Sequence, residues 1–506
     1  MGQTDGVNIA INSLTSALNG IQNQEDGAQD KALAELSFVV KKSLEDESFR
    51  EELAKDETVW EYIIKVISNS LHASAIQEKS IRIKRGVILL ARNLLVADRT
   101  IPSKDDKLIT SIFTFLQSVL PLNIDHILEK GCITASLQCV FNSTVDKTTY
   151  HPNELLSINN FLGDFKKKID HDDLTLYFRC LNNFFNISEA LTCGFKSSEK
   201  TDIIFYNILE NFEQLNFQND LSTHELLIIS IFQKMIVHES FLPYISNLSS
   251  KSDFVRFLKA STVIITSKES WEVFELTVIL SWIYELFQKT LEQIKIHFQN
   301  GIEDLETVYF TIHAVLDVFA TLVKFEHAKK FLLSYKGVEN LVELLGTIHQ
   351  NVKPKKLKDS EKQKQTNTNN ENIKTQDYYK NFPETKSLII ETLSSIIYKD
   401  FSVQELMRET HGLKLVLSNC IIDDNEPFIK ERSIVCLRFL LLNNEKNQEF
   451  VAKLEAKEAV QDDTLDNAGF EVEIVDGKVK LKQKIDVEST RVQTKDENSK
   501  INEVTE

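Results

Sequence analysis

Apolar residues recur at the spacing of an α-helix along almost the whole chain, and this pattern limits the fold more than any other feature. They stand at positions i, i+3, i+4 and i+7, and no alternating strand pattern interrupts them before residue 470. Only 14 glycines and 7 prolines occur in 506 residues, so few positions favour a turn. We therefore predict helices over residues 7–22, 29–44, 57–73, 78–97, 105–119, 131–145, 153–167, 173–188, 200–216, 221–238, 251–266, 269–298, 301–324, 327–349, 385–399, 402–420 and 428–443.

A repeat of about 44 residues is visible towards the C-terminus. Leu393 and Gln404 recur 44 residues later as Leu437 and Gln448, in matching apolar and polar surroundings. Repeats of this length are typical of armadillo and HEAT arrays, whose units contain two or three helices. The sequence therefore predicts an all-α, armadillo/HEAT-like α-solenoid with a small C-terminal β-hairpin, which is one continuous array of repeats.

Two glycines mark the same place in neighbouring repeats. Gly337 and Gly412 lie 75 residues apart, which corresponds to one repeat plus an insertion of about 30 residues. Each stands between two apolar helical stretches, as an inter-helix glycine does in an armadillo repeat. We therefore expect a break between helices at both positions.

The insertion between these repeats has a different composition. Residues 351–383 contain few apolar side chains and carry eight lysines against four acidic residues, so the segment cannot bury enough surface to order itself. Residues 354–358 (PKKLK) also resemble a nuclear localisation patch, but a solvated insertion is the favoured interpretation.

The C-terminal end changes character again. Two runs with alternating apolar residues flank Asp476-Gly477, a pair that favours a type I′ turn, and we predict a hairpin there. The predicted organisation is armadillo-like repeats over 1–350, a disordered insertion over 351–383, further repeats over 384–455, a small extension with the hairpin over 456–484 and a disordered tail over 485–506.

Three asparagines in the N-terminal half fall in similar apolar surroundings. Asn93, Asn142 and Asn183 are separated by 49 and 41 residues. If they lie on the third helix of successive repeats, their amides would line one concave ridge and bind an extended peptide backbone. Alternatively, each asparagine caps or breaks its own helix.

The segment from Cys420 to Glu449 carries the most specific pattern. Asp423, Asp424 and Asn425 are residues that cap helix starts, and Pro427 suits the first turn of a helix. A helix of buried apolar residues is predicted to follow and to stop at Asn443-Asn444; its apolar positions are Ile434, Leu437, Leu440 and Leu441.

This segment resembles the C-terminal signature of the ataxin-10 family, in which a Cys-x-x-Asp-x-x-x-Pro-Phe motif opens a helix. The chain departs from the family pattern at Glu426, Arg432 and Phe439, where the family usually has Asn, Trp and Asn. The resemblance covers residues 420–482 most strongly. The matching residues are Cys420, Asp423, Pro427, Phe428, Glu431, Arg438, Leu440, Asn447 and Gln448.

These signature residues admit a structural or a binding role. Capping by Asp423–Asn425, the fixed backbone of Pro427 and packing of Phe428 account for the turn from Asp423 to Glu431, which favours a joint between the last two helical units. On this interpretation Phe428 is buried, and its replacement by Ala costs about 2–4 kcal/mol. If Phe428 is exposed instead, it is a contact for a partner.

Composition and motifs limit the chemistry. A net charge of -17 argues against sequence-independent nucleic-acid binding, and no apolar run is both long and uncharged enough to span a membrane. The chain has no phosphate-binding loop, dinucleotide fingerprint or HExxH motif, so we expect no enzymatic activity and no cofactor. The first residues also lack the pattern of a secretory signal.

No metal is expected either, because the six cysteines form no C-x-x-C and no His pair has ligand spacing. Some fungal members of the ataxin-10 family carry a copper-transport name. However, Cu(I) favours clustered Cys and Met, and this chain has three methionines.

The function that the resemblance implies is that of a cytoplasmic protein involved in regulating cytokinesis. The repeats themselves predict a non-enzymatic scaffold that binds other proteins along an extended surface, with self-association left open. The alternative is a nuclear-transport adaptor that holds a peptide in an armadillo groove. Such a groove pairs Trp with Asn regularly, whereas this chain has only Trp60, Trp271 and Trp282.

Overall fold

A computed structural model describes residues 3–23, 25–70, 78–99, 107–122, 124–169, 171–196, 199–355, 379–454, 470–475 and 478–483. The chain forms two compact units. Unit 1 comprises Met1–Lys336 and Asn367–Leu388, and unit 2 comprises Gly337–Thr366 and Ile389–Glu506. The predicted middle of the insertion (356–378) and the predicted tail (485–506) lie outside the described residues.

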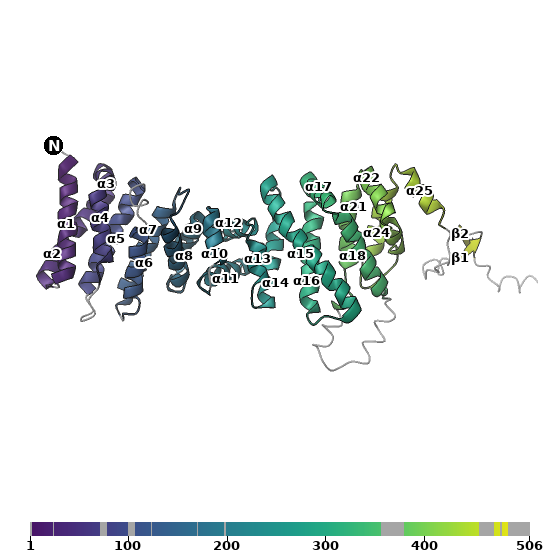
Figure 1. Ribbon diagram of the computed structural model, residues 1–506, viewed down its shortest axis with the longest axis horizontal. Coiled ribbons are helices and arrows are strands. Elements are labelled where there is room, and N and C mark those ends of the chain that lie inside the picture. Colours follow the sequence, from purple (N-terminus) through teal and green to yellow (C-terminus); the bar gives the residue numbers. More distant parts are fainter. Residues whose placement is uncertain are drawn as a thin grey trace, which may run out of the picture. The chain divides into compact units, whose positions relative to one another are not determined.

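The described part of unit 1 is helical (Figure 1). Its helices are α1 (Gln3–Asn23), α2 (Asp26–Glu45), α3 (Glu47–Ala54), α4 (Glu57–Ser68), α5 (Glu78–Ala97), α6 (Lys107–Val119), α7 (His126–Thr144), α8 (Pro152–Asp164), η2 (Lys166–Lys168), η3 (His171–Asp173), α9 (Leu174–Phe184), α10 (Ser188–Lys196), α11 (Glu199–Glu213), α12 (Thr223–Ile236), α13 (Phe241–Ser246), α14 (Lys251–Ser267), α15 (Val273–Asn300), α16 (Leu305–Leu322) and α17 (Glu326–Ser334).

Unit 2 continues with shorter helices and ends in two strands. They are α18 (Gly337–Asn351), α21 (Thr385–Ile397, which begins in unit 1), α22 (Phe401–Glu409), α23 (Gly412–Ser418), α24 (Ile429–Leu441), α25 (Glu445–Ala452), β1 (Phe470–Val475) and β2 (Lys478–Gln483). The two strands pair antiparallel, with Val472 opposite Leu481 and Ile474 opposite Val479. The two residues of the predicted turn between them lie outside the described residues.

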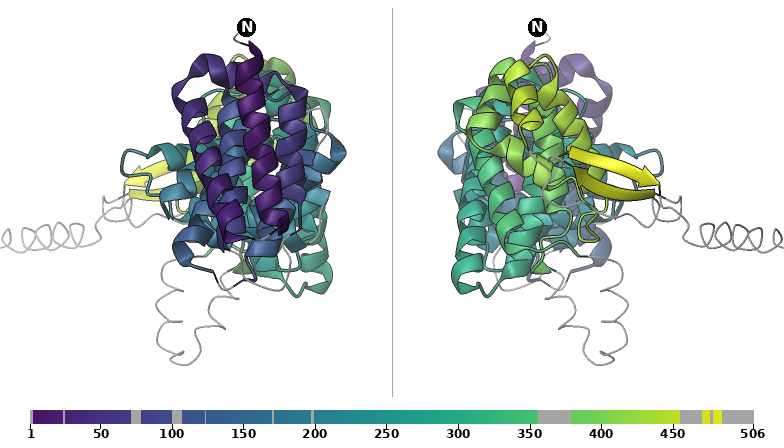
Figure 2. Two further views of the ribbon diagram at one scale, coloured as in Figure 1. Left: turned by 90° about the vertical axis from the view of Figure 1, so that its left-hand side faces the viewer. Right: turned by 90° about the vertical axis from the view of Figure 1, so that its right-hand side faces the viewer.

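The helices of unit 1 stack in two rows. One row runs through α1, α4, α6, α8 and α11, and the other through α2, α5, α7, α9 and α12, each helix packing on the next. Figure 2 shows the first helices of both rows (purple) side by side at the N-terminal end. Stacked helix pairs of this kind are what the repeat period predicts for a solenoid, and the all-α fold is confirmed for the described helices.

The repeat period of 44 residues is confirmed by the helix bounds. α21 and α24 begin at Thr385 and Ile429, and α22 and α25 begin at Phe401 and Glu445, an offset of 44 residues in both cases. The matching polar side chains also take matching places, because the N-terminal residues of α22 and α25 are capped by Asp400 and Asn444.

The predicted breaks at both glycines occur, although the cause differs from a glycine cap. Helices α18 and α23 begin at Gly337 and Gly412. The left-handed backbone belongs to the residues before them, with φ of 59° at Lys336 and 65° at His411. At Gly412 a Cβ would lie 2.6 Å from the flexible Cε atom of Met407 and 3.0 Å from the Cγ2 atom of Val342, so glycine allows close packing there.

Four short helices were not predicted from the periodicity: α3, α10, α13 and α25. They contain between six and nine residues. A window of 11 or more residues averages over such a short element together with its flanking turns, so the helical period is lost. The single helices predicted over 327–349 and 402–420 are likewise two helices each, α17 and α18 in the first case and α22 and α23 in the second.

The ends of the predicted insertion are packed. Phe382 is fully buried, and its ring lies 5.6 Å from that of Phe298 in α15. His313 of α16 hydrogen-bonds to the carbonyl oxygen of Pro383 (2.9 Å), and its burial lowers its pKa to about 4. The packed part of the chain therefore extends further into 351–383 than composition predicts.

One described helix, α16, is long and apolar enough to cross a membrane by length and composition. It packs against α14 and α15, and ten of its 18 residues are buried. Burial of this extent is typical of the core helix in a helical repeat, so the pattern adds no argument for a membrane span.

Candidate functional site

The signature turn before α24 is held by a contact from far along the chain. The Oδ1 atom of Asp423 accepts from the backbone N–H groups of Lys355 (3.0 Å) and Asn425 (3.0 Å), and the N–H of Asp424 donates to the Lys355 carbonyl (2.9 Å). Asp423 does not cap α24, which begins at Ile429, so the predicted capping role is wrong. The acid is instead 2% exposed and ties the turn to the end of α18.

The predicted placement of Pro427 in the first turn of α24 is also wrong. Pro427 is exposed and lies in the turn, two residues before Ile429. The predicted stop at Asn443-Asn444 is confirmed: α24 ends at Leu441, Asn443 has a φ of 56°, and the Asn444 side chain accepts from the N–H of Asn447 (3.0 Å).

The signature residue Asn447 belongs to a buried polar cluster that joins α22, α24 and α25. Its Nδ2 atom donates to the Leu440 carbonyl (2.9 Å), while the Asn444 Nδ2 atom donates to Gln404 Oε1 (3.1 Å). The Nε2 atom of Gln404 donates to the Phe439 carbonyl (2.9 Å). These amides therefore satisfy carbonyl groups that the C-terminus of α24 leaves without helical partners.

Arg408 closes this cluster on its outer side. Its guanidinium donates to Asn447 Oδ1 (3.1 Å) and to both carboxyl oxygens of Glu405. The hydrogen bond from Arg408 is the main reason that the pKa of Glu405 falls to about 2. Asn447 thus has a structural role, whereas its neighbour Gln448 is exposed and donates to the Leu441 carbonyl (2.8 Å).

A stripe of exposed residues runs along α24 on the face away from its core contacts. The buried face consists of Ile429, Ser433, Cys436 and Leu440. We call the exposed face the α24 stripe; it comprises Phe428 (65% exposed), Ile434 (52%), Val435 (47%) and Leu442 (39%), with Glu431 and Arg438 between them. At these helical spacings the six residues lie on one side of the helix.

Two sequence predictions fail at this stripe. Phe428 was expected to be buried, and Ile434 was expected in the core of a buried helix, but both side chains are more than half exposed. The helix carries apolar residues on two sides, and the neighbouring helices α23 and α25 cover only one of them. Periodicity alone does not reveal which apolar side has a partner.

The three departures from the family pattern all make contacts in unit 2. Glu426 is fully buried, and its N–H donates to the Asp423 carbonyl (2.8 Å). Arg432 pairs with Glu391 of α21 (2.9 Å), and the Phe439 ring lies 4.8 Å from Tyr398. Cys420 is half-buried, and its Sγ donates to the Val416 carbonyl (3.6 Å).

The predicted asparagine ridge is not a row of equivalent groups. The Asn93 amide is buried and donates to the Val40 carbonyl (3.2 Å) and the Ser43 hydroxyl (2.9 Å) of α2. Asn142 is half-exposed and donates to the Arg92 carbonyl of α5 (2.9 Å). Both amides join consecutive helices of one row. Because both N–H groups of the Asn93 amide are already donated, none is left for a peptide.

Asn183 is half-exposed, but its neighbour Asn182 makes the contact to the next helix of that row. The carbonyl oxygen of Asn182 accepts from Lys234 of α12 (2.8 Å), and its side-chain oxygen accepts from Ser230 (3.0 Å). Burial lowers the pKa of Lys234 to about 8. The spacing of the asparagines thus indicated the correct region of α9, but Asn182 makes the contact that was predicted for Asn183.

Two of the three tryptophans are core residues. Trp60 (2% exposed) donates to the Ala54 carbonyl (2.8 Å), and Trp282 (5% exposed) donates to the Ile236 carbonyl (2.9 Å). Trp271 is partly exposed, with the Lys268 ammonium 3.9 Å from its ring centre. Trp60 and Trp282 therefore have no exposed ring for a peptide groove.

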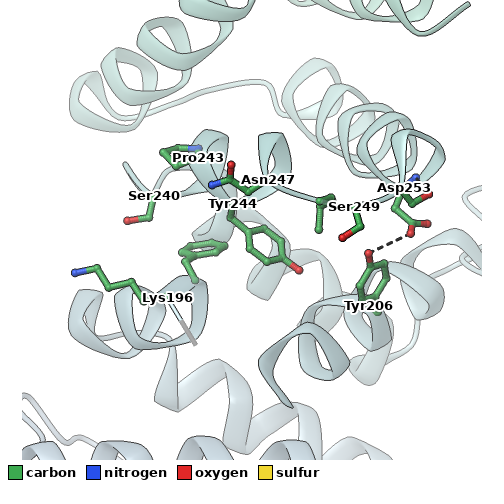
Figure 3. Close-up of a pocket in the computed structure, with 11 residues that line it drawn as sticks. Lys196, Tyr206, Ser240, Pro243, Tyr244, Asn247, Ser249 and Asp253 are labelled. Carbon is green, nitrogen blue, oxygen red and sulfur yellow. Dashed lines mark hydrogen bonds between the residues drawn. The ribbon is translucent and has the colours of Figure 1, made fainter. Parts of the chain in front are cut away.

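An open cleft of about 510 Å³ lies between α10, α11, α13 and α14 (Figure 3). Asp253 is the only carboxylate among the described lining residues. One of its oxygens accepts from the Tyr206 hydroxyl (3.1 Å), and the other accepts from the Arg256 guanidinium (2.9 Å). No His or Cys is among the described lining residues. The described lining of the cleft therefore contains no Ser–His or Cys–His pair.

The cysteine side chains sit in apolar surroundings. Cys132, Cys139, Cys180 and Cys436 are buried, and all six thiols are free. Burial raises the pKa of Cys139 and of Cys436 to about 12, so both are neutral thiols at physiological pH. Within the described ranges, no group of three His, Cys, Asp or Glu side chains could hold a metal ion.

A buried lysine was missed by sequence reasoning. Lys84 of α5 is 1% exposed, and its ammonium donates to the carbonyl oxygens of Ile67 (2.9 Å) and Asn69 at the end of α4. Burial lowers its pKa to about 8. The signal was weak, because Lys84 stands between Ile83 and Arg85 in a helix with four other basic residues, none of which is fully buried.

The comparisons with known proteins agree with the signature. A family model described as the spinocerebellar ataxia type 10 protein domain matches residues 385–482, from α21 to β2. An ataxin-10 homolog of Debaryomyces hansenii is 34% identical over 472 residues, which cover 90% of this chain and 92% of that protein.

Further relatives extend this similarity. The ataxin-10 homolog of Saccharomyces cerevisiae is 32% identical, and the match covers 89% of this chain and 91% of that protein. The ataxin-10 of Xenopus tropicalis is 35% identical over 97 residues, which are 19% of this chain and 20% of that protein. Because the fungal similarity spans about nine-tenths of each protein at more than 30% identity, the chain belongs to the ataxin-10 family.

Proposed function

We propose that this chain is a non-enzymatic scaffold that binds protein partners, with the α24 stripe as its main contact surface. The observation that carries the proposal is the concentration of exposed apolar side chains around this helix. Of 21 large apolar residues that are exposed among the described residues, eight lie between Tyr398 and Leu454. Clustered exposed apolar residues mark interaction surfaces more often than single ones do.

The chemistry of the stripe defines the partner that it fits. Phe428 supplies an aromatic side chain of the kind that dominates binding energy at protein interfaces, and Ile434 and Val435 extend the apolar area. Glu431 and Arg438 flank this area on the same side of α24. The complementary partner surface carries apolar side chains with a basic group opposite Glu431 and an acidic group opposite Arg438.

A non-enzymatic role is supported by the sites that the described residues form. The cleft between α10 and α14 contains one carboxylate, which already accepts from Tyr206 and Arg256. The buried thiols have raised pKa values and are poor nucleophiles. These features favour binding over catalysis.

Family membership supports a proposal for the cellular role. The resemblance to the ataxin-10 family implies a cytoplasmic protein that takes part in cytokinesis, and we propose both the location and the process for this chain. The nuclear-transport alternative receives no support, because Trp60 and Trp282 are buried and Asn93 has no amide hydrogen to offer a peptide.

The proposal is tested by comparing three forms of the tagged full-length chain captured from cells. They are the wild type, Val435→Asp on the stripe, and Phe274→Asp, an equally surface-located control in α15 that is 74% exposed in the wild type. Quantitative mass spectrometry should find proteins retained by the wild type and the control but lost with Val435→Asp. Identical sets of proteins in all three captures would place partner binding away from the stripe.

A further inference from the structure

Two arginines of α5 lie along its contact with α7, the next helix of the same row (Figure 1). Arg85 and Arg92 are seven residues apart, so their side chains leave α5 on the same side. The Arg92 guanidinium donates to Gln138 Oε1 of α7 (2.7 Å). A Cβ added to Gly131 of α7 would lie 2.9 Å from the guanidinium carbon of Arg85. Both guanidinium groups therefore lie against α7, and we call them the arginine pair.

No described carboxylate neutralises the arginine pair. Arg92 donates to the side-chain oxygens of Asn93 (2.7 and 3.0 Å) and Gln138, which are both neutral. Arg85 makes no hydrogen bond or ion pair with a described residue, and its Nε atom is buried without an acceptor. Burial lowers the pKa of Arg92, and the positive charge of Arg85 acts in the same direction. A partly buried charge without a counter-charge costs free energy, so the pair favours an anion from outside the chain.

The neighbouring basic residues differ from the arginine pair, because each has an acidic partner. These ion pairs are Arg82 with Glu78, Lys79 with Asp30, and Lys130 with Asp172. The whole chain carries 75 acidic residues against 58 lysines and arginines, so carboxylates are plentiful. Two adjacent unpaired arginines in such a chain form a local basic site.

The spacing of the arginine pair indicates which chain conformation it fits. Seven residues of an α-helix rise about 10.5 Å, which is the separation of Arg85 and Arg92 along α5. A segment in the polyproline II conformation has about three residues per turn and rises about 3.1 Å per residue. Its side chains at i and i+3 therefore lie on one side, about 9 Å apart. Carboxylates at this spacing can each meet one guanidinium group.

We propose that the arginine pair binds an acidic, extended segment of a partner protein in which glutamate or aspartate recurs at every third position. A guanidinium group matches a carboxylate with two parallel hydrogen bonds, and none of the N–H donors of Arg85 is in use within the described chain. The net charge of -17 disfavours nucleic acid as the anion. The pair belongs to unit 1 and the α24 stripe to unit 2, so this second contact surface does not rest on the proposed function.

The binding is tested with a fluorescein-labelled peptide of Glu-Pro-Pro repeats, which places a glutamate at every third position of a polyproline II chain. Fluorescence anisotropy gives its Kd for the purified full-length chain. Arg85→Gln and Arg92→Gln should each weaken binding at least about tenfold. Arg82→Gln is the matched control on the same helix, and it should change the Kd by less than about twofold, because Glu78 already pairs with Arg82. A neutral peptide of Gln-Pro-Pro repeats should not bind.

Further controls separate binding from folding and from the α24 stripe. Urea denaturation should find Arg85→Gln as stable as the wild type, because Arg85 makes no hydrogen bond with a described residue. Val435→Asp should leave peptide binding unchanged, so the two surfaces can fail separately. The proposal is overturned if the wild type does not bind the glutamate peptide or if Arg85→Gln binds it as tightly as the wild type. It is also overturned if single-stranded RNA displaces the peptide better than unlabelled peptide does.

Discussion

Single polar side chains, most of them buried, join different helices by donating to backbone carbonyl groups, and the acceptor carbonyls at the ends of α4, α9, α12 and α24 have no helical partner. This arrangement satisfies backbone groups that would otherwise be buried at a cost of about 1–3 kcal/mol each. The donors and their acceptor carbonyls are Asn93 to Val40, Lys84 to Ile67, Asn142 to Arg92, Lys234 to Asn182, Trp282 to Ile236 and Asn447 to Leu440.

The first prediction concerns the amide cluster around α25. Asn447→Ala should lower the free energy of unfolding by about 1–3 kcal/mol, because the Leu440 carbonyl loses its donor in a buried site. Gln448→Ala is the matched control, and at this exposed position it should change stability by less than about 0.5 kcal/mol. Urea denaturation measures both, and equal effects would contradict the structural role of Asn447.

The second prediction uses the buried ammonium of Lys84. Its pKa is lowered to about 8 in the folded chain from 10.5, so between these values the unfolded chain binds more protons and folding becomes more favourable as pH rises. The stability of the wild type relative to Lys84→Met should therefore increase by up to about 3 kcal/mol from pH 8 to pH 10.5. A pH-independent difference between the two proteins would show that the ammonium is not desolvated.

At the scale of an element, the local sequence pattern determines where helix α24 forms and ends, but not which of its faces is covered. The existence of α24 and its end just before Asn443 follow from spacing and turn residues, which are local properties. The role of Asp423 does not follow from local properties, because its partner Lys355 is 68 residues away in the sequence. The exposure of Ile434 also depends on whether another element covers that side, which no local pattern specifies.

The third prediction separates the two faces of this helix. Phe428→Ala should change the free energy of unfolding by less than about 0.5 kcal/mol, because the side chain is 65% exposed. Its neighbour Ile429 is 1% exposed, and Ile429→Ala should cost about 2–5 kcal/mol. Thermal or urea unfolding of both variants decides the matter, and a large cost for Phe428→Ala would mean that its ring packs in the chain.

At the scale of the whole molecule, the period of 44 residues and the succession of helices were predictable because they are repeated many times along the chain. Short helices such as α3 and α13 were not, since fewer than three turns leave too little periodic signal. The candidate surface was located by its signature, but the exposure of Phe428 was not predicted. Burial of Phe428 was inferred from residue type, whereas exposure depends on the neighbouring helices.

The α24 stripe is proposed to bind a protein partner. The most direct measurement is the dissociation constant of the purified full-length chain for a partner recovered in the capture experiment, by isothermal titration calorimetry. Val435→Asp should weaken binding at least about tenfold, which corresponds to about 1.4 kcal/mol, while Phe274→Asp should bind as the wild type does. Equal affinities of the wild type and Val435→Asp, with both proteins folded, would contradict the claim.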